Sequence, residues 1–486
     1  MANASAPSAA PTMNNRYYWK ATISGLAGNT LELYDFLLYG TAASLFFPAL
    51  FFPGENQFAA TLASLATFAI GFIVRPLGGL LIGRYGDRFG RKKALLFTLW
   101  VMGSCTIVIG LLPTHAMVGV LAPILLIAVR VVQGIAMGGE WGGSMVLVSE
   151  SVPQNRRGFF SAIPNLGGFV SQLFVAGAIA LVLLLPQDAQ LSWGWRLPFL
   201  ASIVVLIAGL WMRRNLVETP VFEESKAAEA DGTEPEVRRG SIAALFIDHW
   251  RDIILMIGLR FSEGLPYFLL TVFAITYAKS IGVNAAGLQA SILIMAVIAI
   301  PATCFYGWLS DKIGRRPVFA IGSAMVAITA FPFFLLLNTG SFWLITLGYI
   351  LVLNLGHNPV GAVQPALFSE MFPAHSRYSA VAGAREIAGI VTAGLTPFIA
   401  ALLAGPDNTR WYLVAGYVVV GAILSLIAIK IVPETSRRDL VDISRDVSDA
   451  TTDITGPRNP MPDAYHNEQH PGPSRHSVTA SARQRR

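Results

Sequence analysis

The chain has 486 residues, of which 54% are hydrophobic and 13% charged, and its formal net charge is +6. A soluble domain carries about 25% charged residues, so this composition excludes an ordinary water-soluble protein. The two cysteines, Cys105 and Cys304, lie inside apolar stretches, which argues against a disulfide framework or a thiolate metal site.

Twelve apolar stretches follow one another along the chain, each near the ~20 residues that an α-helix needs to cross a bilayer. They cover residues 23–50, 59–83, 94–112, 117–145, 158–185, 195–213, 253–278, 287–309, 317–337, 342–368, 380–404 and 411–432. The fold class expected from them is an all-α integral membrane protein with twelve transmembrane helices.

Composition also divides the chain between and around these stretches. The first residues contain no charged segment ahead of a short apolar one, so we do not expect a cleaved signal peptide. We predict a disordered N-terminal tail, a first six-helix bundle, a charged linker, a second six-helix bundle and a polar, disordered C-terminal tail. Their boundaries are 1–19, 20–219, 220–250, 251–435 and 436–486.

Basic residues mark one side of the predicted membrane. The loops after the even-numbered stretches are rich in Lys and Arg, whereas the opposite loops offer little beyond Lys279 and Arg410. Because basic loops stay in the cytoplasm, we expect both termini and the linker to be cytoplasmic in a plasma or bacterial inner membrane. This topology accounts for the positive net charge without a nucleic-acid partner.

A charged ten-residue segment occurs twice. Residues 83–92 and 307–316 share glycine, acidic and basic positions in the same register, each between two apolar stretches. A weaker echo relates Glu150 and Arg157 to Glu370 and Arg377 at equal spacing. The chain is therefore predicted to consist of two parallel halves, a design common among secondary transporters.

These motifs carry a resemblance to a known family. The segment Gly-x-x-x-Asp-Arg-x-Gly-Arg-Lys at 83–92 resembles the signature loop of the major facilitator superfamily, and Arg130-Val-Val-Gln133-Gly134 is similar to its Arg-x-x-Gln-Gly motif. Residues 28–36, 74–79 and 134–143 look like the metabolite:proton symporter branch, which includes shikimate, alpha-ketoglutarate, citrate and proline-betaine transporters. The resemblance covers about residues 16–437.

The resemblance implies two six-helix bundles that move by alternating access. It also implies a monomer that binds a small molecule and a proton, in contact with membrane lipid, with the proton gradient and no cofactor as the driving force. The repeated loops resemble the superfamily's gating latch, in which an acid meets a neighbouring helix N-terminus. The gating residues are then Gly83, Asp87, Arg88, Gly90, Arg91, Asp311 and Arg315.

Buried acids supply candidates for proton coupling. Glu32 and Asp35 are three residues apart, so they share one face of the first helix. Two carboxylates inside a bilayer cannot both be ionised cheaply, and Arg75 and Arg130 are the available cations. We take Glu32, Asp35, Arg130 and Glu140 as proton-coupling candidates; the alternative is a static ion-pair cluster that only holds helices together.

Substrate-binding candidates come from both halves. Arg260 and Glu263 are three residues apart, just before Pro266, and an arginine in a central cavity is suited to capture a carboxylate. The alternatives are an internal salt bridge for the arginines and ordinary packing for the aromatic residues. The candidate substrate-binding set is Arg75, Arg130, Tyr34, Gln133, Arg260, Glu263 and Tyr267.

The function expected is proton-coupled import of a small polar metabolite, most simply an organic acid of the shikimate or di/tricarboxylate type. Uptake of a proline- or betaine-type osmolyte, efflux by an antiporter and a sensor without transport remain alternatives. Efflux is disfavoured because Ile163 stands where the antiporter motif has glycine. An enzyme is not expected, because the histidines are scattered without metal-ligand spacing.

Overall fold

The computed structural model describes residues 15–89, 91–138, 140–214, 250–372, 374–436 and 438. The part of the chain described in these ranges is helical and contains no β-strand. The expected C-terminal tail, most of the linker and most of the N-terminal tail lie outside the described residues, so the boundaries drawn for them stay predictions.

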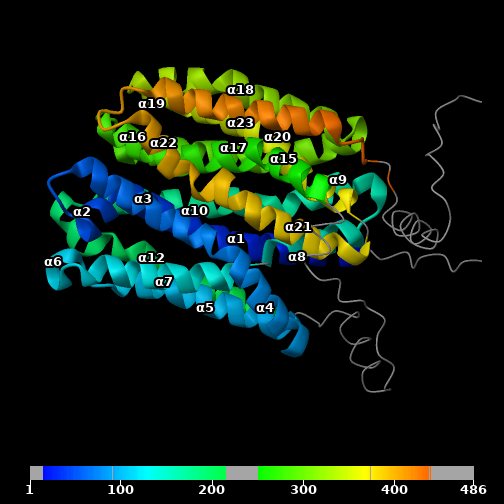
Figure 1. Ribbon diagram of the computed structural model, residues 1–486, viewed down its shortest axis with the longest axis horizontal. Helices are drawn as coiled ribbons and strands as arrows, with labels where there is room; N and C mark the ends of the chain where they lie inside the picture. Colours follow the sequence, from blue (N-terminus) through cyan, green and yellow to red (C-terminus); the bar gives the residue numbers. More distant parts are fainter. Residues whose placement is uncertain are drawn as a thin grey trace, which may run out of the picture. The chain divides into compact units, whose positions relative to one another are not determined.

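The first half contains α-helices that run side by side (Figure 1). Their bounds are α1 Asn15–Leu45, α2 Phe47–Phe51, α3 Gln57–Ile73, α4 Arg75–Phe89, α5 Arg91–Leu111, α6 His115–Val118, α7 Leu121–Met137, α8 Glu140–Ser151, α9 Arg157–Ala162, α10 Leu166–Leu183, α11 Gln187–Ala189 and α12 Arg196–Arg214. The 3₁₀ turns η1 (Gln154–Arg156) and η2 (Ile163–Asn165) flank α9, and the π-helix η3 (Gln190–Gly194) precedes α12.

The second half is built in the same way but carries more π-helix. Its α-helices are α15 Trp250–Phe268, α16 Ala274–Ser280, α17 Ala285–Ile313, α18 Arg315–Asn338, α19 Phe342–Tyr349, α20 Asn358–Met371, α21 Ala374–Gly389, α22 Thr396–Ala404 and α23 Trp411–Ile431. Three π-helices interrupt them: η4 Leu269–Phe273, η5 Ile350–His357 and η6 Ile390–Gly394.

All twelve predicted spans fall on helical segments, which confirms the all-α membrane fold. Among the described residues, seven helical spans are long and apolar enough to cross a membrane, and a bent pair of helices, Gln187–Gly194 and Arg196–Trp211, makes up to eight. Two further predicted spans contain shorter apolar helices, Leu96–Leu111 and Leu121–Met137. In another, residues 342–368, the π-helix η5 separates α19 from α20.

The two halves pack against each other as one compact unit within residues 1–444. Figure 1 shows the blue and cyan helices of the first half along one side and the green to orange helices of the second half along the other. Helix α10 lies against α17, α1 lies against η4, and α3 lies against η6 and α22. The interface between the halves is therefore formed by helices from both.

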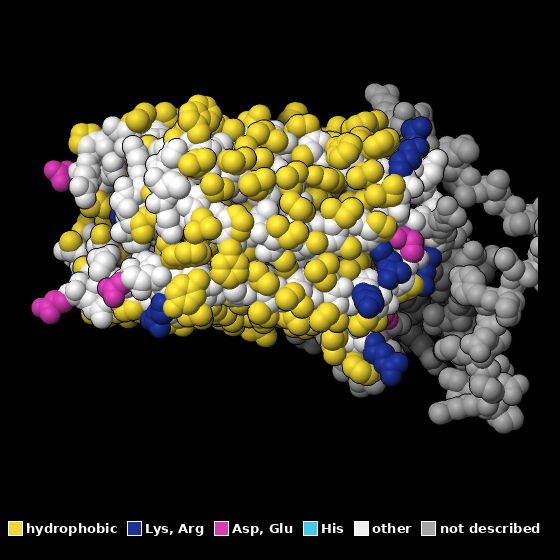
Figure 2. Space-filling model, turned by 90° about the horizontal axis from the view of Figure 1, so that it is seen from above, with side chains coloured by type: hydrophobic (Ala, Val, Ile, Leu, Met, Phe, Trp, Pro, Cys, Tyr) yellow, Lys and Arg dark blue, Asp and Glu magenta, His cyan; other side chains and the backbone are white. Residues whose placement is uncertain are grey.

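The surface of the described residues has an apolar flank and two different ends (Figure 2). Large hydrophobic side chains such as Leu184, Met117 and Trp343 are about 70% exposed or more, as expected for contact with lipid rather than water. Lysine and arginine side chains gather at one end of the view. We name it the basic end and the other the opposite end.

Local sequence explains several helix boundaries and breaks. Asn56 caps α3 by accepting a hydrogen bond from the Ala59 N–H at 3.0 Å, and Asn284 caps α17 in the same way. Pro266 lies inside α15, where it cannot donate a backbone hydrogen bond, and the π-helix η4 follows three residues later. α15 therefore continues through Pro266 to Phe268, and the departure from α-helix begins at Leu269.

Glycine permits a close crossing between α4 and α7. A Cβ atom added at Gly78 would overlap the Ile135 carbonyl oxygen, and one added at Gly138 would overlap backbone atoms of Arg75 and Gly79. At Gly79 the nearest atom to an added Cβ lies 4.0 Å away, on Gly138. Small residues at such crossings let helix backbones pack directly in a membrane.

This crossing predicts different effects for two adjacent glycines. Gly78→Ala should destabilise the protein by about 1–3 kcal/mol, because α4 and α7 must separate to admit the methyl group. Gly79→Ala is the matched control and should be neutral or slightly stabilising, since alanine favours helix. Thermal unfolding of the purified variants in detergent measures both. Equal unfolding temperatures for the two variants would contradict the close crossing.

Candidate substrate cavity between the two halves

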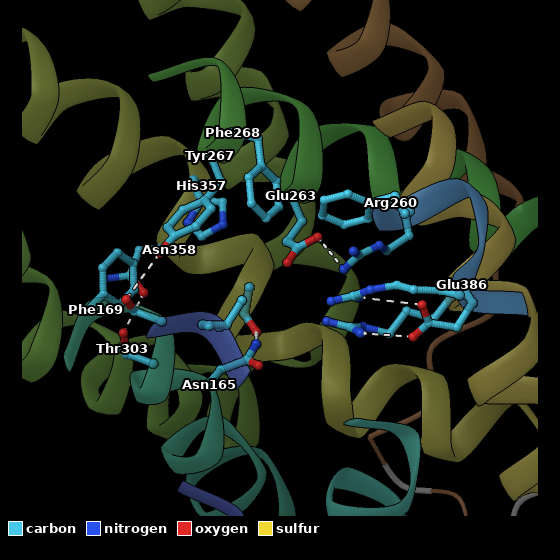
Figure 3. Close-up of a pocket in the computed structure, with 17 residues that line it drawn as sticks. Asn165, Phe169, Arg260, Glu263, Tyr267, Phe268, Thr303, His357, Asn358 and Glu386 are labelled. Carbon is cyan, nitrogen blue, oxygen red and sulfur yellow. Dashed lines mark hydrogen bonds and ion pairs between the residues drawn. The ribbon is translucent and has the colours of Figure 1, made fainter. Parts of the chain in front are cut away.

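A cavity lies between the halves and is lined by residues of both. Helices α4, α10, α15, α17, α20 and α21 all contribute to its wall (Figure 3). It has two chemically distinct parts. The charged half contains Arg75, Arg260, Glu263, Arg385 and Glu386, and the neutral half contains Asn165, Gly168, Phe169, Tyr267, Phe268, Thr303, His357, Asn358 and Gly361.

Arg75 joins the two halves of the chain through ion pairs in the charged half. Its Nη2 lies 3.1 Å from Glu32 Oε1 in the first half, and its Nη1 lies 3.5 Å from Glu386 Oε2 in the second. The guanidinium also lies over the rings of Phe36 and Phe72, with its Cζ 4.1 and 4.7 Å from their centroids. Charge pairing and cation–π contacts together stabilise this buried cation.

Two further arginines complete the charged half. Arg385 Nη1 lies 3.5 Å from Glu386 Oε1, so Glu386 faces two guanidinium groups. Arg260 pairs closely with Glu263 one helical turn further on, and its Nη1 donates to Gln364 Oε1 at 3.2 Å. Arg260 Nε has no hydrogen-bond partner in the described structure. A buried donor without a partner is costly, so the site can accept another oxygen ligand.

The neutral half pairs an aromatic surface with uncharged polar groups. The Tyr267 and His357 rings stack with centroids 5.1 Å apart and planes 28° apart, and Phe169 meets His357 edge-on at 5.9 Å. Thr303 Oγ1 donates to Asn358 Oδ1 at 2.6 Å. His357 Nδ1 is buried and has no hydrogen-bond partner among the described residues. This half offers ring contacts and hydrogen bonds without formal charge.

The structure brings four of the predicted substrate-binding residues into the cavity wall: Arg75, Arg260, Glu263 and Tyr267. It places the other three behind that wall. The Tyr34 hydroxyl donates to the Pro198 carbonyl at 3.0 Å. Arg130 Nη1 donates to Gln133 Oε1 at 2.7 Å, and Gln133 donates to Thr106. A direct role of Tyr34, Arg130 or Gln133 in substrate binding stays a prediction.

Two of the predicted proton-coupling acids lie near different cations. Glu32 pairs with Arg75, whereas Asp35 lies within electrostatic range of Arg130. The Phe36 ring lies between the two guanidinium groups, 4.1 Å from Arg75 Cζ and 4.3 Å from Arg130 Cζ. Glu32 and Asp35 are both buried. Glu140 begins α8, and its side chain lies outside the described part of the structure.

At the basic end, Asp311 closes the interface between the halves. Its two carboxylate oxygens accept hydrogen bonds from the backbone N–H groups of Gly158 and Phe159, at 2.7 and 2.9 Å. These N–H groups belong to the first turn of α9, where a helix N-terminus favours negative charge. Arg315 Nη1 also donates to Asp311, at 2.8 Å. The second copy of the repeated loop thus binds the first half of the chain.

The repeated Glu and Arg residues pair across the halves at the same end. Arg157 of the first half lies 3.1 Å from Glu370 of the second, and Arg377 of the second half lies 2.6 Å from Glu150 of the first. Glu370 is fully buried and also accepts a hydrogen bond from Thr435 at 2.6 Å. The two copies of the echo therefore exchange partners, as expected for parallel repeats related by a pseudo-two-fold axis.

Glu434 holds the N-terminus of α18 from beyond the end of α23. Its carboxylate accepts hydrogen bonds from the Arg315 and Arg316 N–H groups at 2.8 and 3.1 Å. Burial raises the pKa of Glu434, but hydrogen bonds from the backbone of Arg315, Ser436 and Arg316 outweigh burial and leave the pKa below its usual value. The group therefore stays ionised at neutral pH, as a helix cap requires.

The first copy of the repeated loop is less fully described. Asp87 and Arg88 lie in α4 and Arg91 begins α5, but their side chains lie outside the described structure, as do the surroundings of Gly83 and the whole of residue 90. Gly83, Asp87, Arg88, Gly90 and Arg91 therefore remain predicted gating residues.

The opposite end is closed by other contacts. Lys279, at the end of α16, donates from Nζ to the Leu45 carbonyl at the end of α1, at 3.0 Å. Ser44 Oγ donates to the Val272 carbonyl in η4 at 2.8 Å. A cation on a helix C-terminus mirrors the acid on a helix N-terminus at the basic end. The halves are thus in contact at both ends of the interface.

Several cavity residues were not singled out as site candidates from sequence. These are Asn165, Thr303, His357, Asn358, Arg385 and Glu386. Their sequence signal was polarity inside apolar spans, which is costly in a membrane and points to function by default. Glu370 carried a clearer signal, because its spacing to Arg377 repeats that of Glu150 to Arg157.

Comparisons with known proteins agree with this architecture. Residues 20–447 match the family described as "Sugar (and other) transporter". The chain is 38% identical to the shikimate transporter of Escherichia coli strain K12 over 421 residues, covering 86% of this chain and 95% of that protein. It is 33% identical to the proline/betaine transporter of the same strain, covering 92% and 89%.

Solved structures show the same fold. The partially occluded, inward-open xylose transporter XylE from E. coli aligns with a TM-score of 0.64 at 19% identity, covering 88% of this chain and all of that one. A D-xylose-proton symporter structure aligns with the same TM-score at 20% identity, covering 86% and 99%. Together, the repeated loops, the two-bundle fold and these matches show that the chain belongs to the sugar (and other) transporter family of the major facilitator superfamily.

Proposed function

We propose that this protein is a proton-coupled symporter that imports a small organic acid by alternating access. The observation that carries the proposal is a buried cavity between two six-helix bundles whose charged half holds three arginines beside glutamates. Arginine suits a carboxylate ligand because its fork of donors binds both oxygens. Acids in low dielectric beside cations suit proton exchange.

The relatives support both the proposed substrate class and the proposed coupling to protons. The similar shikimate transporter carries an organic acid by its name, and the similar D-xylose structure is titled a proton symporter. Another relative, 36% identical, is an inner membrane metabolite transport protein. We place this chain in the inner membrane with its basic end and both termini in the cytoplasm. Labelling of a cysteine introduced at position 231 by an impermeant reagent added to intact cells would contradict that orientation.

Uptake of radiolabelled shikimate by cells or proteoliposomes tests the function directly. We expect accumulation above the external concentration that collapses when a proton uncoupler is added. Accumulation that survives the uncoupler would exclude proton coupling, and binding without uptake would indicate a sensor. Efflux driven by an inward proton gradient would indicate an antiporter.

Osmolyte uptake is the second candidate, because the proline/betaine transporter is also a relative and the cavity contains aromatic rings. A quaternary ammonium group can bind against aromatic faces. Competition of unlabelled proline or betaine with shikimate distinguishes the two. Strong competition by betaine and none by organic acids would favour the osmolyte function.

Alternating access predicts that weakening one closure opens that end. Asp311→Asn removes the charge that binds the α9 N-terminus, so we expect the basic end to open more often. Loss of a charge-assisted hydrogen bond costs about 1–3 kcal/mol, which corresponds to a fivefold or larger shift in the equilibrium from a closed to an open basic end. Alkylation of Thr303→Cys by an impermeant maleimide, in a Cys105→Ala/Cys304→Ala background and in inside-out vesicles, measures it. The exposed Asp407→Asn is the control.

The opposite closure predicts the reverse effect. Lys279→Met keeps the apolar stem but removes the donor to the Leu45 carbonyl, so the same cysteine should become more accessible in right-side-out vesicles. Lys279→Arg keeps a donor and should remain near wild type. If Lys279→Met increased labelling from the basic end instead, Lys279 would not be part of the closure at the opposite end.

Proton coupling predicts separable effects on accumulation and exchange. Glu32→Gln or Asp35→Asn should abolish uphill accumulation, because each removes a negative charge that balances a buried arginine. Exchange of substrate across the membrane should survive in at least one variant, since exchange needs no net proton movement. The exposed Asp188→Asn serves as control. Wild-type accumulation in the double variant would remove both acids from the mechanism.

A further inference from the structure

The charged half of the cavity is electrically balanced. Arg75, Arg260 and Arg385 supply three positive charges, while Glu263 and Glu386 in the wall and Glu32 behind Arg75 supply three negative ones. Each glutamate lies within ion-pair distance of at least one of these arginines. We call these six residues the charge cluster. An additional anion would leave one negative charge without a counter-charge in a low-dielectric site, which is strongly unfavourable.

Glu386 is the acid held least closely in the charge cluster. Its contacts with Arg75 and Arg385 are both 3.5 Å, at the limit of a hydrogen bond, whereas Glu32 lies 3.1 Å from Arg75. Its ion pair with Arg75 also connects the second half of the chain to the first. A carboxylate that enters the cavity can therefore take the place of Glu386 on these guanidinium groups with the smallest loss of existing contacts.

Few other titratable groups near Glu386 can compensate for the negative charge of an entering anion. The cavity's further titratable side chains are His357 and Tyr267 in the neutral half. At the basic end, Glu150 and Glu370 are paired with Arg377 and Arg157, and the Glu140 side chain on α8, which packs against α21, lies outside the described structure. The charged groups facing Glu386 from its own and neighbouring helices are Arg385, Arg75, Glu32, Arg260 and Glu263.

The neutral half restricts the charge that the rest of the substrate can carry beyond its carboxylate. The described residues that line it include no Lys, Arg, Asp or Glu. Its stacked Tyr267 and His357 rings offer a flat face, and Asn165, Thr303 and Asn358 offer hydrogen-bonding groups at the side. A second carboxylate there would be buried without a cation, whereas hydroxyl groups on a ring would find partners.

We infer that the substrate is a monocarboxylate with an uncharged, hydroxylated ring, and that its carboxylate replaces Glu386 on the arginines while Glu386 takes up one proton. This inference rests on the proposed function and specifies the ligand and the coupling ratio of the same site. The proton comes from the water on the side from which the substrate enters and adds to a Glu386 carboxylate oxygen. No covalent bond in the substrate forms or breaks, and one substrate anion moves with one proton.

Binding and proton uptake by the purified full-length protein test the inference. Shikimate, a cyclic hydroxylated monocarboxylate, should bind more tightly than citrate, 2-oxoglutarate, proline or betaine. In weakly buffered solution, binding should take up about one proton per shikimate, and its Kd should rise about tenfold per pH unit where Glu386 is ionised. Preference for a di- or tricarboxylate, for proline or betaine, or no binding of any of these solutes, would overturn the inference.

Proton uptake and shikimate binding by variants of the charge cluster distinguish an effect of charge balance from an effect of misfolding. Glu386→Gln should still bind shikimate but take up no proton, with a Kd nearly independent of pH. The double variant R385Q/E386Q removes one charge of each sign and has no carboxylate at position 386, so it should bind shikimate more weakly than Glu386→Gln, because the entering carboxylate lacks a free counter-charge. The exposed Glu55→Gln should behave as wild type. Proton uptake that persists in Glu386→Gln, or binding by the double variant as tight as that by Glu386→Gln, would overturn the inference.

The same measurements distinguish failure of the inference from failure of the proposed function. If an uncoupler abolishes shikimate accumulation but Glu386→Gln still takes up a proton, symport stands and the role of Glu386 is wrong. If no organic acid is accumulated and no proton is taken up on binding, both fail. Circular dichroism and monodisperse elution of each variant identify any loss that is due to misfolding.

Discussion

The ion pairs of Arg75 are the interaction on which the centre of the structure depends. This guanidinium is almost fully buried, and it meets a carboxylate from each half of the chain. Removing a charge from water costs several kcal/mol unless a partner repays it, so each half needs the other to keep its buried charges paired. The aromatic rings of Phe36 and Phe72 exclude water and add cation–π contact. Arg75 and Glu386, which form one of these ion pairs, line the cavity.

At the two ends of the interface, side chains of opposite charge bind opposite helix termini. At the basic end an aspartate binds the N-terminus of α9, and at the opposite end a lysine binds the C-terminal carbonyl of α1. Each of these contacts involves few groups, which suits the proposed opening and closing of the two ends. The π-helices η4 and η5, next to the cavity, contribute Val272 to the opposite closure and His357 to the cavity wall. Departures from α-helix are frequent at functional sites.

The basic end also shows how a sequence repeat becomes an interface. Each copy of the Glu and Arg echo could have formed an ion pair within its own half, yet Arg157 binds Glu370 and Arg377 binds Glu150. Reciprocal pairing places two ion pairs between the halves, one buried and one with a partly exposed glutamate, and both must break for the basic end to separate. Thr435 and Glu434, beyond α23, add the end of the second bundle to this network.

The membrane-spanning helical fold, the two parallel halves and the family could all be predicted from the sequence, because long apolar runs and repeated motifs are local properties of the chain. Sequence also identified Arg75, Arg260, Glu263 and Tyr267, which line the cavity, since charged or aromatic residues inside apolar spans stand out individually. Which of these groups meet depends on tertiary packing. Glu32 and Glu386 are far apart in sequence but share Arg75, while Asp35, a neighbour of Glu32 on one helix, lies within electrostatic range of Arg130. Helix periodicity specifies a side chain's direction within its own helix, whereas a buried ion pair depends on how helices from two halves are packed.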